Sequence, residues 1–237
     1  MGLTEVAAAL VAKGKGILAA DESGGTIKKR FDAIGLESTE EARRAYRELL
    51  FTAPEVEQFL SGVILFDETI RQSTADGTPF PRLLAERGII PGIKVDRGVV
   101  PLAGAAGETV TEGLDDLRQR FEEYVALGAR FAKWRATILI GRRRPSDYAL
   151  AVNAQALARY AALCQEAGLV PIVEPEVLMD GDHTAAESLA ATQRALGALY
   201  DELRAQRVEL EGTLLKPNMV LSGYDCPEQA SDDEIAS

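Results

Sequence analysis

Six short apolar runs, each containing or followed by a charged residue, constrain the fold of this 237-residue chain more than any other feature. Each run is too short for an independent helix and is flanked by Gly or Pro, so each is predicted to be a β-strand. Because the runs are continuously apolar and do not alternate, we expect strands covered on both faces, as in parallel sheets. The predicted strands are Gly16–Asp21, Gly62–Phe66, Ile90–Val95, Arg130–Arg135, Leu169–Glu174 and Gly212–Lys216.

The longer segments between these runs carry apolar residues at spacings of three and four, which is typical of amphipathic helices. The predicted helices are Ser38–Phe51, Thr111–Leu127, Asp147–Ala167 and Thr184–Arg207, with the start of another at Ser231–Ser237. Strands alternating with helices predict βαβ units and a mainly parallel sheet with right-handed crossovers. No linker divides the chain, and the looser stretches Ser73–Thr78 and Ala103–Thr109 are predicted to be loops. Residues 1–237 are therefore expected to form one domain.

Charged residues stand at the same end of nearly every predicted strand. They are Asp21, Asp67, Glu68, Lys94, Asp96, Lys133, Arg135, Glu174, Glu176 and Lys216. Charged side chains are almost never fully buried unless they are paired, so this placement favours a shared polar site. A (β/α)₈ barrel builds its active site in this way, at the carboxyl ends of its strands. The alternative is that each strand simply ends where the chain returns to water.

Net charge, hydropathy and cysteine content exclude several classes of function. The formal net charge of −11 argues against non-specific binding to nucleic acid or to an anionic membrane, and no apolar run reaches the length of a membrane span. The N-terminus has no secretory signal pattern, and Cys164 and Cys226 show no metal-ligand spacing, so reduced thiols in a cytoplasmic protein are expected. His183 is the only histidine and is expected at the surface.

The lysines inside the apolar runs have a chemical use. A lysine in an apolar setting beside other cations loses proton affinity, and its neutral amine can then attack a carbonyl. Lys133 and Lys216 are candidates for this role, with a nearby carboxylate moving protons. The turn Ser23–Thr26 and the basic residues after it (Lys28, Lys29, Arg30) could hold a phosphate at a helix N-terminus. A solvated helix face is the alternative for these basic residues.

Six segments of the chain resemble class I fructose-bisphosphate aldolases. They occur in the order of that family and with similar spacing, and together they cover essentially the whole chain. The segments are LAADESGGTIKKR (Leu18–Arg30), ILFDET (Ile64–Thr69), GIKVDRGVVPLAG (Gly92–Gly104), FAKWR (Phe131–Arg135), VPIVEPE (Val170–Glu176) and LLKPNMV (Leu214–Val220). The resemblance implies a (β/α)₈ barrel of which this chain supplies about the first six βα units.

The resemblance also implies roles for individual residues. Lys216 resembles the imine-forming lysine, Glu174 the general acid/base, and Glu176 its partner in the site. Lys133 is similar to the second lysine, which lowers the proton affinity of Lys216, and Asp21 to the aspartate near the C4 hydroxyl. Five residues resemble the residues with which the family binds its substrate: Lys94, Arg135, Thr26, Lys29 and Arg30. Ordinary rim charges are the alternative reading of Glu174 and Glu176.

By resemblance, the reaction is reversible cleavage of fructose 1,6-bisphosphate to dihydroxyacetone phosphate and glyceraldehyde 3-phosphate. The family uses no cofactor, and the chain offers no convincing His/Asp/Glu metal set, so no metal is expected. The expected partner is a small phosphosugar, with no nucleic acid and no membrane. A homo-oligomer, a tetramer by resemblance, is expected in the cytoplasm.

The chain departs from the family in one respect. The seventh-strand phosphate loop, the eighth-strand arginine and the C-terminal tail of the family have no counterpart here, so a truncated product or a fragment with low activity is expected. Two alternatives to the main interpretation stay open. One is a non-catalytic protein that binds a phosphosugar or a partner, and the other is a Schiff-base aldolase for another phosphosugar.

Overall fold

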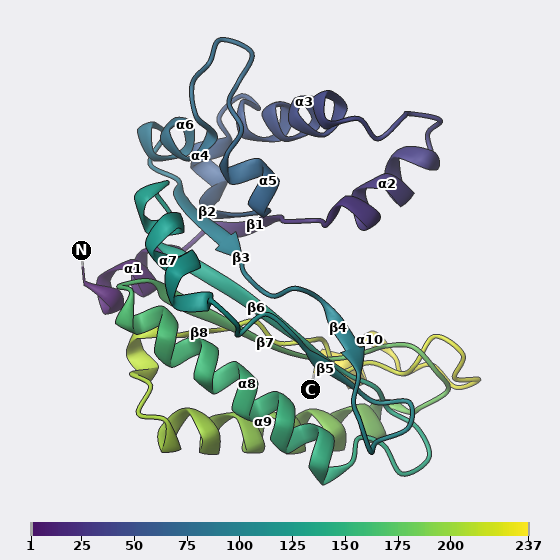
Figure 1. Cartoon of the computed structure of the whole chain (residues 1–237). Helices are drawn as coiled ribbons and strands as arrows, with labels where there is room; N and C mark the ends of the chain where they lie inside the picture. Colours follow the sequence, from purple (N-terminus) through teal and green to yellow (C-terminus); the bar gives the residue numbers. More distant parts are fainter. Residues whose placement is uncertain (1, 237) are drawn as a thin grey trace.

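The six predicted strands form one parallel sheet whose neighbours follow chain order (Figure 1). The computed structural model describes residues 2–236. The strands are β1 (Gly16–Ala20), β2 (Leu60–Leu65), β3 (Ile90–Lys94), β6 (Phe131–Ile138), β7 (Val170–Val177) and β8 (Leu214–Leu215). The order is β1-β2-β3-β6-β7-β8 and every neighbouring pair is parallel. This curled sheet with its helices confirms the prediction of a partial (β/α)₈ barrel.

Two strands run further than predicted. β6 continues past Arg135 to Ile138, and β7 continues past Glu174 to Val177, with the two strands paired along their whole length. The predicted strands were ended at charged residues, because charged side chains are expected to face water. Here the charged residues point into a polar cleft, so the backbone pairing continues beneath them.

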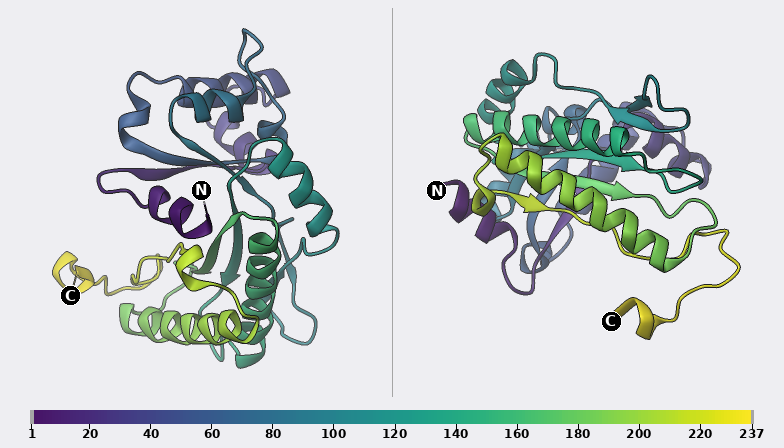
Figure 2. Two further views of the ribbon diagram at one scale, coloured as in Figure 1. Left: turned by 90° about the vertical axis from the view of Figure 1, so that its left-hand side faces the viewer. Right: turned by 90° about the horizontal axis from the view of Figure 1, so that it is seen from below.

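The predicted helices are present, and shorter helices accompany them. The helices are α1 (Leu3–Leu10), α2 (Gly24–Asp32), α3 (Glu40–Phe51), α4 (Val56–Phe59), α5 (Asp67–Ile70), α6 (Phe80–Glu86), α7 (Leu117–Ala126), α8 (Asp147–Glu166), α9 (Ala185–Ala205), the 3₁₀ turn η1 (Leu210–Gly212) and α10 (Asp232–Ala236). Side-chain oxygens of Ser146 and Thr184 cap the amino ends of α8 and α9. These two helices run side by side across one face of the sheet (Figures 1 and 2). The expected helix at Ser231–Ser237 is α10, except that Ser237 lies outside the described residues.

An antiparallel hairpin ends at Thr111, the residue at which a helix was predicted to begin. Its strands are β4 (Val99–Pro101) and β5 (Thr109–Thr111), so α7 begins later, at Leu117. The Thr111 hydroxyl donates a hydrogen bond to the Arg135 carbonyl at 2.8 Å, which fastens the hairpin beside β6. Three-residue strands carry too little periodicity to be read from the sequence, and only this packing against β6 reveals them.

The two faces of the sheet bury different side chains, because successive residues of a strand point to opposite sides. Facing the helices, Ala132, Trp134 and Ala136 of β6 join the main core with Val173 of β7. Facing the interior, Phe131 packs in a second cluster with α1, whose residues Val6, Ala7 and Leu10 close the amino ends of the strands. Lys133 and Arg135 follow Phe131 by two and four residues, so their side chains point to the same interior side of the sheet as Phe131. The alternation therefore puts apolar residues at the amino ends and charged residues at the carboxyl ends of the interior.

Gly92 shows how tightly the interior is filled near α1. A Cβ atom at this position would lie 2.3 Å from the Phe131 ring, a separation that real side chains do not show. Because Gly92 has no side chain, the Phe131 ring of the neighbouring strand β6 can lie directly against the backbone of β3. Figure 2 shows α1 near this amino-end side of the sheet, away from the carboxyl ends that carry the charges.

One side chain outside the strands differs from expectation. His183 was predicted at the surface but is buried, and neither ring nitrogen has a hydrogen-bond partner among residues 2–236. The segment after β8 folds back over it, with Gly223 N–H donating to the His183 carbonyl at 2.7 Å. In the same returning segment Met219 is exposed and Cys226 is buried. Cys164 is buried in α8.

Alkaline pH is predicted to destabilise the fold through groups buried under α8. Burial raises the pKa of the Cys164 thiol and of the Tyr160 phenol well above their ordinary values. Burial lowers the pKa of Lys133, but the Asp21 and Glu174 carboxylates outweigh it and raise the pKa. In the unfolded chain these groups lose protons at about pH 8.5, 10 and 10.4, before the folded protein does. Their stabilisation is therefore complete below about pH 8.5 and is lost as pH rises from there.

Urea unfolding between pH 7 and 11 tests this prediction. The free energy of unfolding should fall above about pH 9, by up to about 1.4 kcal/mol per pH unit for each titrating group. In Cys164→Ala the thiol is gone, so the decline should begin nearer pH 10. A free energy that rises with pH across this range would contradict the prediction.

Candidate functional site

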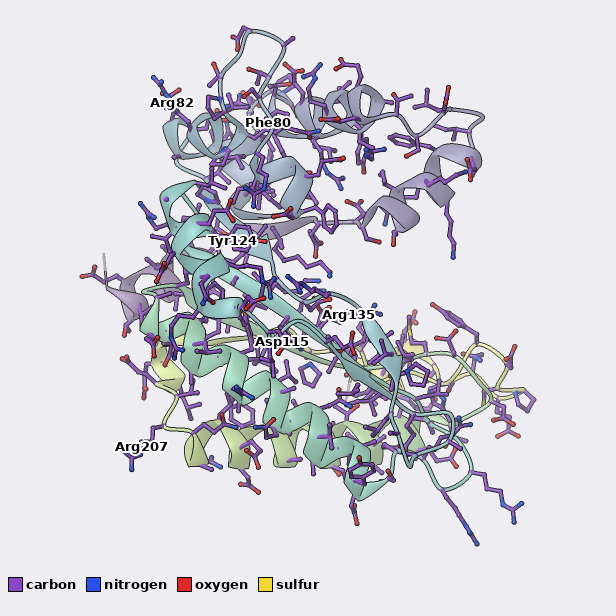
Figure 3. All side chains as sticks on the ribbon, in the orientation of Figure 1. Phe80, Arg82, Asp115, Tyr124, Arg135 and Arg207 are labelled. Atoms are coloured by element: carbon purple, nitrogen blue, oxygen red, sulfur yellow. The ribbon has the colours of Figure 1, made fainter. Side chains whose placement is uncertain are left out.

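A cleft of about 850 Å³ opens at the carboxyl ends of the strands. Eight Lys and Arg residues line it against seven Asp and Glu residues, so its local balance is positive in a chain of net charge −11. Figure 3 labels two of the lining residues, Tyr124 on α7 and Arg135 on β6, and shows Arg82 and Arg207 pointing to solvent elsewhere. A positive cleft can attract an anion on an acidic protein, because salt screens the distant negative charge.

Lys133 lies at the centre of the charged cluster. Its ammonium nitrogen is 2.8 Å from Asp21 Oδ2 on one side and 3.2 Å from Glu174 Oε2 on the other. All three residues are buried, and burial alone would lower the pKa of Lys133. The two carboxylates outweigh that effect and raise it, contrary to the expectation that this lysine loses proton affinity. Lys133 is thus held as a cation.

Lys216 contacts the same carboxylate as Lys133. Its ammonium group donates a short hydrogen bond to Glu174 Oε1, and its backbone N–H donates to the Val173 carbonyl of β7 at 2.9 Å. The side chain is 43% exposed, whereas that of Glu174 is 5% exposed, so Lys216 is open to a molecule in the cleft. Glu174 therefore lies between an accessible lysine and a buried one.

The remaining strand cations are also paired. The Arg135 guanidinium forms a short ion pair with Glu176, which joins β6 to β7. The Lys94 ammonium lies 2.5 Å from Asp96 Oδ1, and Asp96 in turn faces the Arg135 backbone N–H at 3.4 Å. These contacts bring Lys94, Arg135 and Glu176 to one wall of the cleft, as the strand-end pattern predicted.

The far wall is formed by the start of the chain. Thr26 and Arg30, one helical turn apart on α2, line the cleft, and Arg30 forms a short ion pair with Glu22. Lys29 is exposed and does not line the cleft. Of the three residues predicted for this wall, Thr26 and Arg30 therefore meet the cleft and Lys29 does not.

Comparison with known proteins decides the family. A sequence model of the family described as fructose-bisphosphate aldolase class-I matches residues 2–237. The probable fructose-bisphosphate aldolase class 1 of Xylella fastidiosa (strain Temecula1) is 62% identical over 234 residues, which cover 99% of this chain and 70% of that protein. The chain belongs to the class I fructose-bisphosphate aldolase family.

Two further relatives agree with this assignment. The cytosolic fructose-bisphosphate aldolase 5 of Arabidopsis thaliana is 57% identical over 230 residues, covering 97% of this chain and 64% of that protein. The fructose-bisphosphate aldolase of Plasmodium falciparum, solved in complex with TRAP and a small-molecule inhibitor, superimposes with a TM-score of 0.96 at 48% identity. That match covers 98% of this chain and 68% of the Plasmodium chain.

Some residues that line the cleft of this aldolase carried no sequence signal. On the side of α5 and α7, the Tyr124 hydroxyl donates to Asp67 Oδ1 at 2.8 Å, and Arg71 lies 3.0 Å from the same oxygen. Asp67 follows a strand and could be anticipated, but Arg71 and Tyr124 come from helices and enter through tertiary packing alone. Glu22 adjoins Asp21 in the sequence, and this position after a strand is the signal that could have identified it.

Metal and membrane features can be stated for the described chain only. Within residues 2–236, no group of three or more His, Cys, Asp or Glu side chains is arranged to hold a metal ion. No helix in the same range is both long enough and apolar enough to cross a membrane.

Proposed function

We propose that this aldolase cleaves fructose 1,6-bisphosphate reversibly to dihydroxyacetone phosphate and glyceraldehyde 3-phosphate through an imine on Lys216. The observation that carries the proposal is the sharing of the buried Glu174 carboxylate between Lys216 and Lys133. An accessible amine, a proton-transfer group and a fixed cation are what imine chemistry requires within reach of one carbonyl.

The contacts suggest an order of events. Lys216 gives a proton to Glu174 along their short hydrogen bond, and the neutral amine attacks the C2 ketone of the open-chain sugar. One proton moves from the new C–N nitrogen to the alkoxide to give the carbinolamine. Glu174 then returns its proton to the carbinolamine hydroxyl, which leaves as water and leaves the iminium on Lys216. Lys133 is positively charged beside both groups and stabilises the negative charge that develops on oxygen during the attack.

The iminium then accepts electrons. The C3–C4 bond breaks, its electron pair enters the enamine, and the C4 hydroxyl proton passes to a carboxylate as glyceraldehyde 3-phosphate forms. Asp21, on the opposite side of Lys133 from Glu174, is the residue proposed for contact with that hydroxyl. Protonation of the enamine at C3 and hydrolysis of the imine release dihydroxyacetone phosphate.

The two walls of the cleft suit the two ends of a phosphosugar. Lys94, Arg135 and Glu176 line one wall, and Thr26 with Arg30 lines the other. We assign Lys94 and Arg135 to hydroxyl and phosphate contacts near the reacting carbons, and Thr26 and Arg30 to the phosphate remote from the imine. Lys29, outside the cleft lining, is left with a longer-range electrostatic role.

Borohydride trapping tests the imine. The protein is incubated with dihydroxyacetone phosphate, reduced with borohydride and digested, and the peptide that carries Lys216 should gain the reduced adduct. Modification of another lysine, or of none, would contradict the proposal. Cleavage rates with fructose 1,6-bisphosphate and with fructose 1-phosphate then establish whether this substrate is preferred over another phosphosugar.

We further infer that the protein works in the cytoplasm as a homo-oligomer. The cytosolic description of the Arabidopsis relative supports the first inference. Exposed large apolar side chains support the second, because such groups are often covered at subunit interfaces; they include Ile34, Leu49 and Phe59. Light scattering in solution would measure the assembly.

A further inference from the structure

A single carboxylate, that of Glu22, lies between two guanidinium groups at the far wall of the cleft. Arg30 on α2 contacts Glu22 Oε1, and Arg47 on α3 places Nη1 2.6 Å from Oε2. Arg47 Nη2 also donates to the Glu22 backbone carbonyl at 3.2 Å. Arg47 therefore holds both the side chain and the backbone of the residue that precedes α2.

The two arginines differ in where they lie. The Arg30 side chain is 58% exposed and lines the cleft, whereas the Arg47 side chain is 3% exposed and does not. Arg47 packs under Glu22, with its guanidinium carbon 5.2 Å from the Tyr46 ring, and Tyr46 meets Phe31 of α2 edge-on at 5.8 Å. Arg47 thus cannot touch a molecule in the cleft, but it contacts the residue that positions Arg30. In Figure 1, α2 follows the end of β1, and α3 lies above it in the view, over α5.

We propose that Arg47 is a positioning residue for the substrate phosphate remote from Lys216. It acts through Glu22, because it holds the Glu22 carboxylate in place and partly neutralises its negative charge. Arg30 is then oriented by Glu22 and can still bind an anion. This inference rests on the proposed function, which places a phosphate at Thr26 and Arg30.

Charge explains why a buried arginine matters here. With Arg47 present, one carboxylate faces two guanidiniums and the group carries a net positive charge. Without Arg47, Glu22 and Arg30 form a neutral pair, and the carboxylate competes with phosphate for the Arg30 donors. A buried carboxylate that loses its partner also costs stability and draws its remaining cation closer. Lysine is an incomplete replacement, because one ammonium cannot reproduce the planar fork that holds both the Glu22 carboxylate and its backbone carbonyl.

The test measures the binding of two ketone-free ligands by calorimetry: the reduced, hexitol forms of fructose 1,6-bisphosphate and of fructose 1-phosphate. Only the first has the remote phosphate. In Arg47→Met, we expect affinity for the bisphosphate to fall about tenfold, the loss of one charge-assisted contact, while monophosphate affinity changes less than about twofold. Arg47→Lys should fall between wild type and Arg47→Met. Arg44→Met, which breaks ion pairs with Glu41 and Glu48 on the same helix, is the matched control and should change neither affinity.

A double-mutant cycle shows whether Arg47 acts through Glu22. In the Glu22→Gln background the carboxylate through which Arg47 acts is gone, so the additional change in bisphosphate affinity caused by Arg47→Met should be less than about twofold. Equal losses for both ligands, a full tenfold loss in the Glu22→Gln background, or a wild-type protein that does not favour the bisphosphate would overturn the inference. Failure of the imine proposal is separately visible, because borohydride trapping at Lys216 does not depend on Arg47.

Discussion

Replacing Lys216 with methionine is expected to abolish cleavage of fructose 1,6-bisphosphate, with a loss in kcat of at least about 10⁴-fold, because a covalent nucleophile is removed. The fold should survive, because Lys216 is 43% exposed and Glu174 keeps its ion pair with the buried Lys133. Steady-state rates and borohydride trapping measure the effect, and the adduct with dihydroxyacetone phosphate should disappear together with activity.

Lys15→Met provides the control for Lys216→Met. Lys15 is an exposed lysine whose ammonium donates to the Glu57 carbonyl, away from the cleft lining. Its replacement should leave both cleavage and trapping at the wild-type level. If Lys216→Met retained trapping, another lysine would be the nucleophile, and Lys133 would be the first to examine.

Replacing Lys133 with methionine is expected to damage both stability and activity. The side chains of Asp21 and Glu174 are 9% and 5% exposed, and without the Lys133 ammonium these two buried carboxylates lose their shared partner. Removing one member of a buried ion pair costs about 3–5 kcal/mol in the free energy of unfolding. The rate of cleavage should fall by at least about 10²-fold, because the fixed cation beside the reacting oxygen is gone.

A second substitution separates the two effects of Lys133→Met. In Asp21→Asn/Lys133→Met, one of the two unpaired buried carboxylates is removed. The free energy of unfolding, measured in urea, should therefore recover a substantial part of its loss. Activity should not recover, because neither the cation nor the proposed contact to the C4 hydroxyl returns. If Lys133→Met unfolded at the wild-type urea concentration, the ion pairs seen around Lys133 would contribute nothing to the fold.

Much of the site could be anticipated because two rules of strand geometry act together. Parallel strands bring their carboxyl ends to one edge, and residues two apart on a strand point to the same side. Applied to the sequence alone, these rules place Lys133 with Arg135 and Glu174 with Glu176 in one cleft. The same rules identify Asp21, Lys94 and Lys216 as members of that cleft.

The sequence did not determine which charges meet. Lys133 was expected to lose proton affinity, but the fold brings Asp21 and Glu174 to within 3.2 Å of its ammonium, and its pKa is raised. Lys29 was expected beside Arg30 in the site, but only Thr26 and Arg30 line the cleft. The Arg47–Glu22 contact joins α3 to the segment after β1, and no local sequence pattern predicts it.

The sequence by itself thus determined the sheet, the edge at which the charges gather and the family to which the chain belongs. These features depend on local periodicity and on motifs carried by single segments. Only the tertiary structure decided the ion-pair partners, the direction of the Lys133 pKa, the β4–β5 hairpin and the burial of His183. Each of these depends on atoms from segments distant in the chain, whose separation is set by strand register and helix packing.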